Sequence, residues 1–377
     1  MGIIVLTAAV LFLAWSNGAN DNFKGVATLW GSGTASFKTA LIWATASTLV
    51  GSLVTVLIAP KIARIFSGKG LLQDAAIDPA LLAAIGAAGA TTVFLATFLH
   101  MPTSTTHALT GALVGAGLMA GGGINWGLLL SKFAQPLLLS PIIAIAGTAI
   151  FYRFFRWGRH RLGLKADSCI CVEQESPLAT PLPAGSGAMI AAGIQPAGLT
   201  VTLGEECAEP DANRLMGVRA QPVVDGLHYL SAGAVCFARA VNDTPKIAAL
   251  LLAAGAFFEI PPTPSVLVLV AVAMTLGGWL QSRKVAQTMS QKITSLNSGQ
   301  GLTANLITAG LVLGASRLGL PVSTTHVSCG SIFGIGLATK NGNRSTILQI
   351  LTAWVTTLPA GLLLGAVFYL TFRAIGL

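Results

Sequence analysis

Two short groups of polar residues occur twice in this chain, in the same order and at nearly the same spacing. The first group is an Asn-Asp pair with a lysine three residues after the acid, and the second is a proline-led run of hydroxyl residues that ends in histidine. The members are Asn20, Asp21, Lys24 and the run Pro102–His107 in one copy, and Asn242, Asp243, Lys246 and the run Pro321–His326 in the other. From acid to histidine the copies span 86 and 83 residues, which indicates two homologous halves.

The hydroxyl runs have the residue types of an anion site. Their central residues are Ser104, Thr105 and Thr106 in one half, and Ser323, Thr324 and Thr325 in the other. Each run follows a proline and opens a helical segment, so hydroxyls and free backbone N–H groups converge where the helix dipole favours negative charge. Simple N-capping would explain a single copy. The repetition of three hydroxyls in both halves favours a shared site for a tetrahedral oxyanion.

Asp21 and Asp243 are the candidate carboxylates inside the membrane. A charge at the bilayer centre costs at least about 2.5–3.5 kcal/mol, so residues of this kind usually have a function. Carboxylate and amide oxygens suit a hard cation such as Na⁺. An ion pair with the lysine three residues later is also possible if the segment is helical. Both interpretations stay open, and they do not exclude each other.

Three further residues are expected to support the site. His107 and His326 end the hydroxyl runs and are expected to orient their neighbours, while proton transfer stays possible because imidazole titrates near neutral pH. Arg239 lies in an apolar stretch and has no basic counterpart at Asn17, the equivalent position of the first half. We expect it to pair with an acid or to lie near the anion.

The composition shows what must position these residues. The chain has 53% hydrophobic and only 9% charged residues, against about 25% charged in a soluble domain. Apolar segments near the roughly 20 residues that cross a bilayer cover residues 39–59, 80–100, 126–152, 265–281, 302–315 and 345–372. Its 43 glycines fit closely packed membrane helices. The sequence predicts an all-α polytopic membrane protein with broken helices and re-entrant hairpins.

The chain divides by composition into three parts. Residues 1–152 form a first transmembrane repeat, residues 153–214 a central loop or insert, and residues 215–377 a second transmembrane repeat. The insert starts with basic residues, which places it in the cytoplasm under the positive-inside rule and the protein in the plasma (inner) membrane. Topology explains the net charge of +9, and no aromatic-interleaved basic face indicates nucleic acid.

Local breaks are expected within the two repeats. Pro245 removes a backbone donor and is predicted to break the helix that carries the second acid. The glycine-rich segments after Pro102 and Pro321 are predicted to be half-helices or re-entrant hairpins. Within the insert, Gly198–Leu203 is a candidate short strand.

At these residues the chain resembles the inorganic phosphate transporter (PiT) family of Na⁺- or H⁺-coupled symporters. The run Gly18-Ala19-Asn20-Asp21 matches that family's signature, and the two Ser-Thr-Thr-His turns match its paired re-entrant motifs. The resemblance covers both halves but not the insert. It implies two inverted repeats with about a dozen membrane segments, usually dimeric, with phosphate near the midplane and cations at the Asn-Asp motifs.

One departure from the family pattern concerns the cation. Family motifs read Asn-Asp-x-x-Asn, whereas the last position here is Lys24 in one copy and Lys246 in the other. A lysine ammonium could occupy the space of a bound Na⁺ or reach the anion as a point charge. We therefore expect less dependence on Na⁺ than in the relatives, with proton coupling or another anion preference as consequences.

The sequence thus predicts a secondary active transporter, a cation-coupled symporter, of inorganic phosphate. The expected substrate-binding residues are Ser104, Thr105, Thr106, Ser323, Thr324, Thr325, Asn20, Asn242, Lys24 and Lys246. The coupling cation, Na⁺ or H⁺, is expected at Asp21 and Asp243, with no other metal and no cofactor. We expect a homodimer in the lipid bilayer that does not bind nucleic acid.

Three alternatives stay open. A sulfate or related oxyanion permease of the same fold, with H⁺ rather than Na⁺ coupling, would suit a site built only of donors. An anion channel lined by the hydroxyl turns is a second alternative. An enzyme is disfavoured because the sequence carries no metal-ligand cluster and no nucleophile motif.

Overall fold

The computed structural model describes residues 1–58, 66, 71–73, 77–162, 169–174, 199–204 and 214–377. The chain divides into two compact units. The first comprises residues 1–153 and 228–377, and the second comprises residues 154–227.

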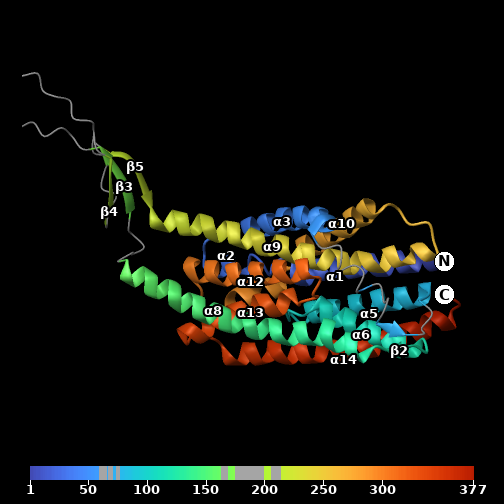
Figure 1. Ribbon diagram of the computed structural model, residues 1–377. Helices are drawn as coiled ribbons and strands as arrows, with labels where there is room; N and C mark the ends of the chain where they lie inside the picture. Colours follow the sequence, from blue (N-terminus) through green and yellow to red (C-terminus); the bar gives the residue numbers. More distant parts are fainter. Residues whose placement is uncertain (59–65, 67–70, 74–76, 163–168, 175–198, 205–213) are drawn as a thin grey trace, which may run out of the picture. The chain divides into compact units, whose positions relative to one another are not determined.

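Helices build the first unit (Figure 1). In the first half they are α1 (Gly2–Asp21), α2 (Ala27–Gly31), α3 (Phe37–Ile58), α5 (Pro79–Phe98), α6 (Thr105–Met119), α7 (Trp126–Leu128), the π-helix η1 (Leu129–Ala134) and α8 (Gln135–Arg161). In the second half they are α9 (Ala220–Ala253), the 3-10 helix η2 (Ala254–Ala256), α10 (Thr263–Gln281), α11 (Arg283–Gln287), the π-helix η3 (Thr288–Lys292), α12 (Ser298–Leu318), α13 (Thr324–Thr339) and α14 (Arg344–Ala374). The end of α8 and the start of α9 belong to residues of the second unit. The two-residue strands β1 (Leu72–Gln73) and β2 (Gly123–Ile124) pair antiparallel.

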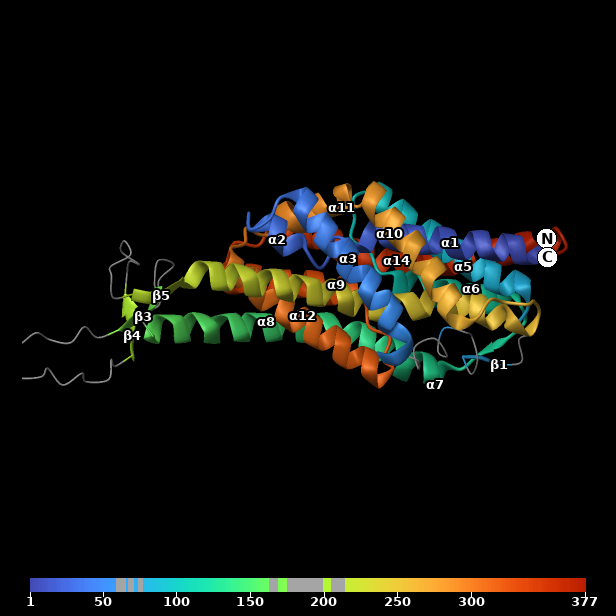
Figure 2. The same ribbon diagram turned by 90° about the horizontal axis from the view of Figure 1, so that it is seen from above.

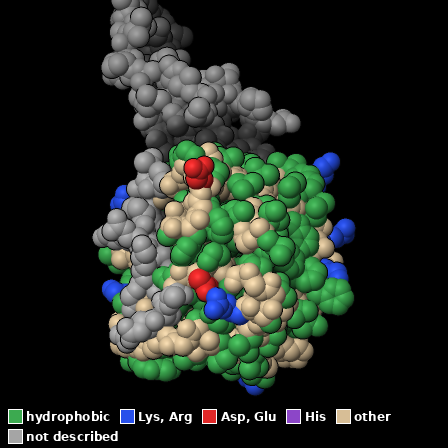
Figure 3. Space-filling model, turned by 90° about the vertical axis from the view of Figure 1, so that its right-hand side faces the viewer, with side chains coloured by type: hydrophobic (Ala, Val, Ile, Leu, Met, Phe, Trp, Pro, Cys, Tyr) green, Lys and Arg blue, Asp and Glu red, His purple; other side chains and the backbone are tan. Residues whose placement is uncertain are grey.

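Seven helical segments of the described chain are long and apolar enough to cross a membrane. They are Gly2–Asp21, Phe37–Thr55, Pro79–Phe98, Trp126–Arg161, Thr263–Gln281, Ser298–Leu318 and Arg344–Ala374. Six of them overlap the apolar segments predicted from the sequence. Large apolar side chains such as Leu138, Ile142 and Val355 are exposed on them, and the face seen in Figure 3 is largely hydrophobic. The predicted polytopic helical membrane protein is confirmed.

The two helices that follow the hydroxyl runs are short. α6 has 15 residues and α13 has 16, fewer than the roughly 20 that cross a bilayer. α6 packs on α14 almost backbone to backbone, since a Cβ added to Gly115 would lie 1.9 Å from the carbonyl oxygen of Leu362. This close approach of small residues fixes α6, and with it the hydroxyl turn at its start.

The two acid motifs have different backbones. α1 ends at Asp21 and the chain turns through residues 22–26 before α2, as the sequence predicted. α9, however, continues through Pro245, so the predicted break there is wrong. The proline leaves the carbonyl of Val241, four residues earlier, without its helical donor. The hydroxyl of Thr55 in α3 donates to that carbonyl at 2.9 Å, which satisfies the backbone and lets the helix continue.

α1 and α9 run in opposite directions. α1 starts at the end of the molecule marked N, whereas α9 finishes near that end (Figure 1), and the view turned by 90° shows the same (Figure 2). This is the relation that inverted repeats require. The full inverted-repeat relationship of the remaining helices stays a prediction.

The second unit contains a three-stranded antiparallel sheet. Its strands are β3 (Cys169–Gln174), β4 (Leu199–Gly204) and β5 (Arg214–Arg219), in the order β4-β3-β5. Val172 of β3 lies opposite Val201 of β4 and Met216 of β5. The strand predicted at Gly198–Leu203 is confirmed as β4 from Leu199 onwards, and Gly198 lies outside the described residues. The cytoplasmic location and the boundaries of the insert stay predictions.

Candidate functional site

Lys24 lies at the centre of a buried polar network that joins the two halves. Its side chain is almost inaccessible to solvent. The ammonium donates to Oδ1 of Asp21, to the carbonyl oxygen of Thr103 at 2.8 Å, and to the hydroxyl Oγ1 of Thr325. A lysine ammonium has three N–H donors, so each donor has one acceptor of a different chemical kind.

Lys246 makes an equivalent set of hydrogen bonds. Its ammonium donates to Oδ1 of Asp243 at 3.1 Å, to the carbonyl oxygen of Val322 at 3.1 Å, and to Oγ1 of Thr106 at 2.7 Å. The acceptors stand at the equivalent positions of the repeated motifs. Each lysine therefore binds the acid and a carbonyl of its own half and a threonine hydroxyl of the other half.

Both ammonium groups occupy positions that would suit a metal cation. Carboxylate, carbonyl and hydroxyl oxygens are the ligands that hard cations take in proteins, and three such oxygens surround each nitrogen. Removing one member of a buried ion pair costs about 3–5 kcal/mol, because the other charge stays unpaired.

A metal cluster of the usual side chains is a separate question. Within the described chain, no group of three or more His, Cys, Asp and Glu side chains could hold a metal.

Ser104 and Ser323 cap the two short helices. Ser104 Oγ accepts the N–H of His107 at 3.1 Å, and Ser323 Oγ accepts the N–H of His326 at 3.1 Å. Capping uses a lone pair of the serine oxygen and leaves its O–H free to donate. The N–H groups of the two threonines after each serine have no acceptor within the helix. Both turns therefore cap their helix and still carry O–H and N–H donors that the helix itself does not use.

Asn17 is a further site residue, which the sequence identified only as the counterpart of Arg239. Its Nδ2 donates to Thr105 Oγ1 at 2.9 Å, and lies 3.3 Å from Asp21 Oδ2 and 3.4 Å from Asp243 Oδ2. One amide of α1 thus contacts a hydroxyl turn and the acids of both halves. Its position four residues before Asp21, on the same helix face, is the signal that could have identified it.

Asn20 and Asn242 bind the backbone of the hydroxyl runs. Asn20 donates to the carbonyl of Met101 at 3.0 Å and accepts the N–H of Thr103 at 3.0 Å. Asn242 donates to the carbonyl of Val322 at 3.1 Å. Each amide therefore holds the hydroxyl turn of its own half against the acid motif of that half.

Arg239 is buried between α1 and α3. Its guanidinium donates to Asn17 Oδ1 at 3.1 Å, to Thr48 Oγ1 at 2.8 Å and to Asn22 Oδ1 at 3.5 Å. All three acceptors are neutral. Among the described residues, no ion pair joins Arg239 to a carboxylate.

The rings of His107 and His326 are in contact at an angle of 37°, with centroids 4.5 Å apart, and His326 stacks on Trp354 at 3.9 Å. These histidines are equivalent residues of the two halves, as are Asn17 and Arg239, which also touch. Contacts between equivalent residues are expected where two repeats meet around a twofold axis. Thr324 Oγ1 donates to Asp243 Oδ2 at 3.4 Å, so the structure brings every site residue predicted from the sequence into one buried region.

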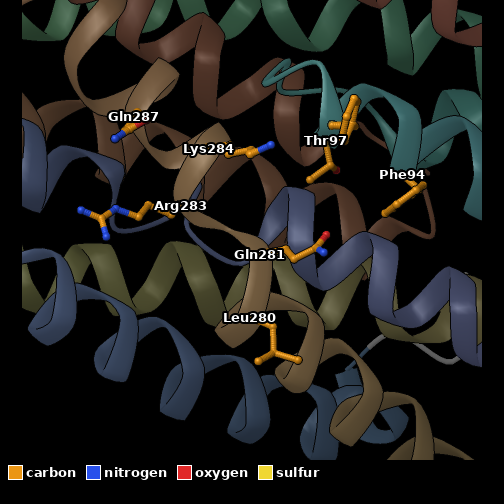
Figure 4. Close-up of a pocket in the computed structure, with 8 residues that line it drawn as sticks. Phe94, Thr97, Leu280, Gln281, Arg283, Lys284 and Gln287 are labelled. Atoms are coloured by element: carbon orange, nitrogen blue, oxygen red, sulfur yellow. The ribbon is translucent and has the colours of Figure 1, made fainter.

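A pocket of about 450 Å³ lies beside this region (Figure 4). Its lining residues are Phe94, Thr97, Phe98, Leu280, Gln281, Arg283, Lys284 and Gln287. Lys284 is directed towards Thr97, whereas Arg283 is directed away from it (Figure 4). Thr97 also accepts a hydrogen bond from Asn20 at 2.9 Å, so the pocket wall contacts the acid motif of the first half.

Comparison with known proteins shows where such a chain belongs. Residues 17–365 match the model of the phosphate transporter family. A putative phosphate permease of Thermococcus kodakarensis is 28% identical, over 99% of this chain and 98% of the relative. A probable low-affinity inorganic phosphate transporter of Bacillus subtilis is 26% identical over 99% of both chains. The chloroplastic inorganic phosphate transporter 2-1 of Arabidopsis thaliana is 28% identical, over 97% of this chain and 71% of the relative.

A solved structure has the same fold. It is described as the sodium-dependent phosphate transporter, and it matches with a TM-score of 0.75 over 99% of both chains at 20% sequence identity. At that identity the likeness establishes the fold alone. Together with the match to the family model, these findings show that the chain is a transporter rather than an enzyme, and that it belongs to the phosphate transporter family.

Proposed function

We propose that this chain is a secondary transporter of inorganic phosphate that binds the anion between its two hydroxyl turns and does not require Na⁺. The observation that carries the proposal is the pair of equivalent networks around Lys24 and Lys246. Each combines an acid motif of one half with a hydroxyl turn of the other half. An anion bound there would contact both halves.

The Oδ2 atoms of Asp21 and Asp243 favour phosphate over sulfate. The lysines bind Oδ1 of each aspartate. Oδ2 of Asp21 lies 3.3 Å from Asn17 Nδ2, and Oδ2 of Asp243 lies 3.4 Å from both Asn17 Nδ2 and Thr324 Oγ1, all at the long end of the hydrogen-bond range. The Oδ2 atoms can therefore accept a hydrogen bond from a ligand. Phosphate carries a hydroxyl at neutral pH and sulfate does not, so only phosphate can use both these acceptors and the donors of the turns. Sulfate stays the second candidate because the donors alone would also bind it.

The lysines support independence from Na⁺. In a symporter the coupling cation must leave the site in each cycle, whereas an ammonium is attached to the chain. Lys24 and Lys246 already neutralise the two aspartates at which a coupling Na⁺ was expected. The name of the structural neighbour says that it depends on sodium. Because of its lysines, we propose that this chain does not depend on sodium and that any coupling uses H⁺.

Uptake into proteoliposomes tests the proposal. Labelled phosphate and labelled sulfate are offered at fixed pH, in Na⁺ buffer and in buffer where K⁺ replaces Na⁺. We expect saturable phosphate uptake at equal rates in both buffers, with counterflow that separates a carrier from a channel. Loss of uptake without Na⁺ would refute the proposed role of the lysines, and preference for sulfate would refute the substrate.

A matched variant restores the amide that the family pattern has at these positions. In Lys24→Asn with Lys246→Asn, both aspartates lose their tethered cations, and Na⁺ is expected to stimulate uptake or to raise the thermal unfolding midpoint of the purified protein. The wild type is expected to show neither response. Equal Na⁺ responses of the two proteins would argue against cation replacement.

The serine hydroxyls test the anion site itself. Ser104→Ala with Ser323→Ala removes one donor from each turn and is expected to raise the half-saturation concentration for phosphate about tenfold, the equivalent of 1.4 kcal/mol. Loss of a cap costs about 1 kcal/mol of stability per helix. The unfolding midpoint of each single variant therefore measures how much of the effect comes from the lost cap. An unchanged half-saturation concentration would refute the assignment. The homodimer and the plasma membrane location are also proposals. The mass of the purified particle in detergent tests the first, and fractionation of cell membranes tests the second.

A further inference from the structure

Among the described residues, the buried site holds three basic side chains and only two acids, so one positive charge has no acid paired with it. Lys24 is paired with Asp21, and Lys246 with Asp243. Arg239 is the third buried cation, with 1% of its surface exposed. Its hydrogen bonds go to neutral oxygens, and its Nε has no hydrogen-bond partner within the described structure.

The charge is not needed for packing or hydrogen bonding alone. Arg239 stands 222 residues after Asn17, its equivalent in the first half, and the two side chains hydrogen-bond to each other at 3.1 Å. In the first half a neutral amide is sufficient at this position. A buried guanidinium loses more hydration than an amide does, so the retained charge calls for a partner of opposite sign.

Asn17 connects this charge to the hydroxyl turn. Its Oδ1 accepts from Arg239, and its Nδ2 donates to Thr105 at 2.9 Å. A hydrogen bond from a cation polarises the amide and strengthens its own N–H donors. The positive charge of Arg239 therefore acts on the turn where the two halves meet.

We propose that Arg239 is a positioning and charge-balancing residue for the transported oxyanion. The anion supplies the negative charge that the described residues around Arg239 do not. Arg239 acts through Asn17 and through its electric field, without direct contact with the ligand. This inference rests on the proposed function, because it needs the hydroxyl turns to bind an oxyanion.

The test uses Thr48, which accepts from the Arg239 guanidinium at 2.8 Å and has no place in the proposed anion site. Thr48→Asp puts a carboxylate against Arg239, and Thr48→Asn is the matched neutral control. Half-saturation concentrations and maximal rates are measured in proteoliposomes for phosphate and sulfate. We expect Thr48→Asp to raise the half-saturation concentration about tenfold or more, because an internal acid competes with the anion for the same charge. Thr48→Asn is expected to keep an affinity close to that of the wild type, because its neutral amide oxygen can still accept from Arg239.

A second pair of variants separates charge from shape. Arg239→Gln is expected to raise the half-saturation concentration as Thr48→Asp does, and Arg239→Lys, which keeps the charge, to restore most of the affinity. A purely structural role would instead lower the maximal rate and the yield of folded protein and leave the half-saturation concentration unchanged. That pattern would overturn the inference, as would equal affinities of Thr48→Asp and Thr48→Asn.

The failure of this inference differs from that of the proposed function. If the wild type carries an oxyanion and the Thr48 pair shows equal affinities, only the role of Arg239 is refuted. If the wild type carries neither phosphate nor sulfate, the proposed function is refuted and this inference with it.

Discussion

The two halves of the site make the same hydrogen bonds on different backbones. Lys24 lies in the turn after α1, where the helix has ended, whereas Lys246 lies inside the continuous helix α9. Both ammonium groups still bind an acid, a carbonyl and a threonine hydroxyl. The comparison shows that the position of the charged nitrogen is common to both halves, and that the local secondary structure is not.

The crossing of α1 with α10 and the equivalent crossing of α9 with α3 also differ in one residue. A Cβ on Gly18 would lie 1.8 Å from the carbonyl oxygen of Met274, so α1 needs glycine at its crossing with α10. The second half has Ala240 at the equivalent position. Both crossings have a glycine on the opposing helix: a Cβ on Gly277 would lie 1.9 Å from the carbonyl oxygen of Trp15, and one on Gly51 would lie 2.6 Å from that of Phe237, the equivalent residue. The second motif departs from the Gly-Ala pattern without losing the close packing.

The largest expected difference between the halves concerns the lysines. Lys24→Met is expected to abolish uptake and to destabilise the protein by about 3–5 kcal/mol, because Asp21 is left as an unpaired buried charge. Lys246→Met should be milder, since Asp243 Oδ1 also accepts from Asn242 at 3.0 Å and helix α9 holds the backbone. Uptake rates and thermal unfolding midpoints of the two purified variants check the order. Equal losses would mean that the backbone difference has no energetic consequence.

The continuous helix of the second half makes the next prediction. Thr55→Val removes the hydroxyl that satisfies the carbonyl of Val241 and should cost about 1–3 kcal/mol, the usual penalty for a buried group without a partner. In a Pro245→Ala background the new N–H can bond that carbonyl, so the same change should cost less than about 1 kcal/mol. Thermal unfolding of the four proteins measures the coupling, and additive effects would contradict this account of the helix.

The smallest effect is expected in the turns before the hydroxyl runs. His100 has φ 64° and Gly319, its equivalent in the second half, has φ 71°. An L side chain in this left-handed region costs roughly 1–2 kcal/mol. His100→Gly is therefore expected to stabilise the protein slightly and Gly319→Ala to destabilise it, as measured by unfolding midpoints. Shifts of the same sign would show that factors other than φ decide these turns.

Much of the fold followed from the sequence because its signals are local or periodic. The apolar segments predicted six of the membrane helices, and the repeated motifs predicted which residues are buried together. Pro245 was misjudged because its effect depends on Thr55, which is 190 positions away in the chain and supplies the missing hydrogen bond. Asn17 was underrated for a similar reason, since only its partners across the two halves reveal its place in the site.

By itself the sequence determined the membrane class, the twofold motif and the chemical types of the site, because each depends on composition and spacing along one chain. Only the tertiary structure decided the hydrogen-bond partners of the buried charges. It placed the hydroxyl of each half on the lysine of the other, and it left Arg239 among neutral oxygens. The physical reason is that the interaction energy of a buried charge depends mainly on the atoms within a few ångströms of it. The folding of distant segments determines which atoms those are.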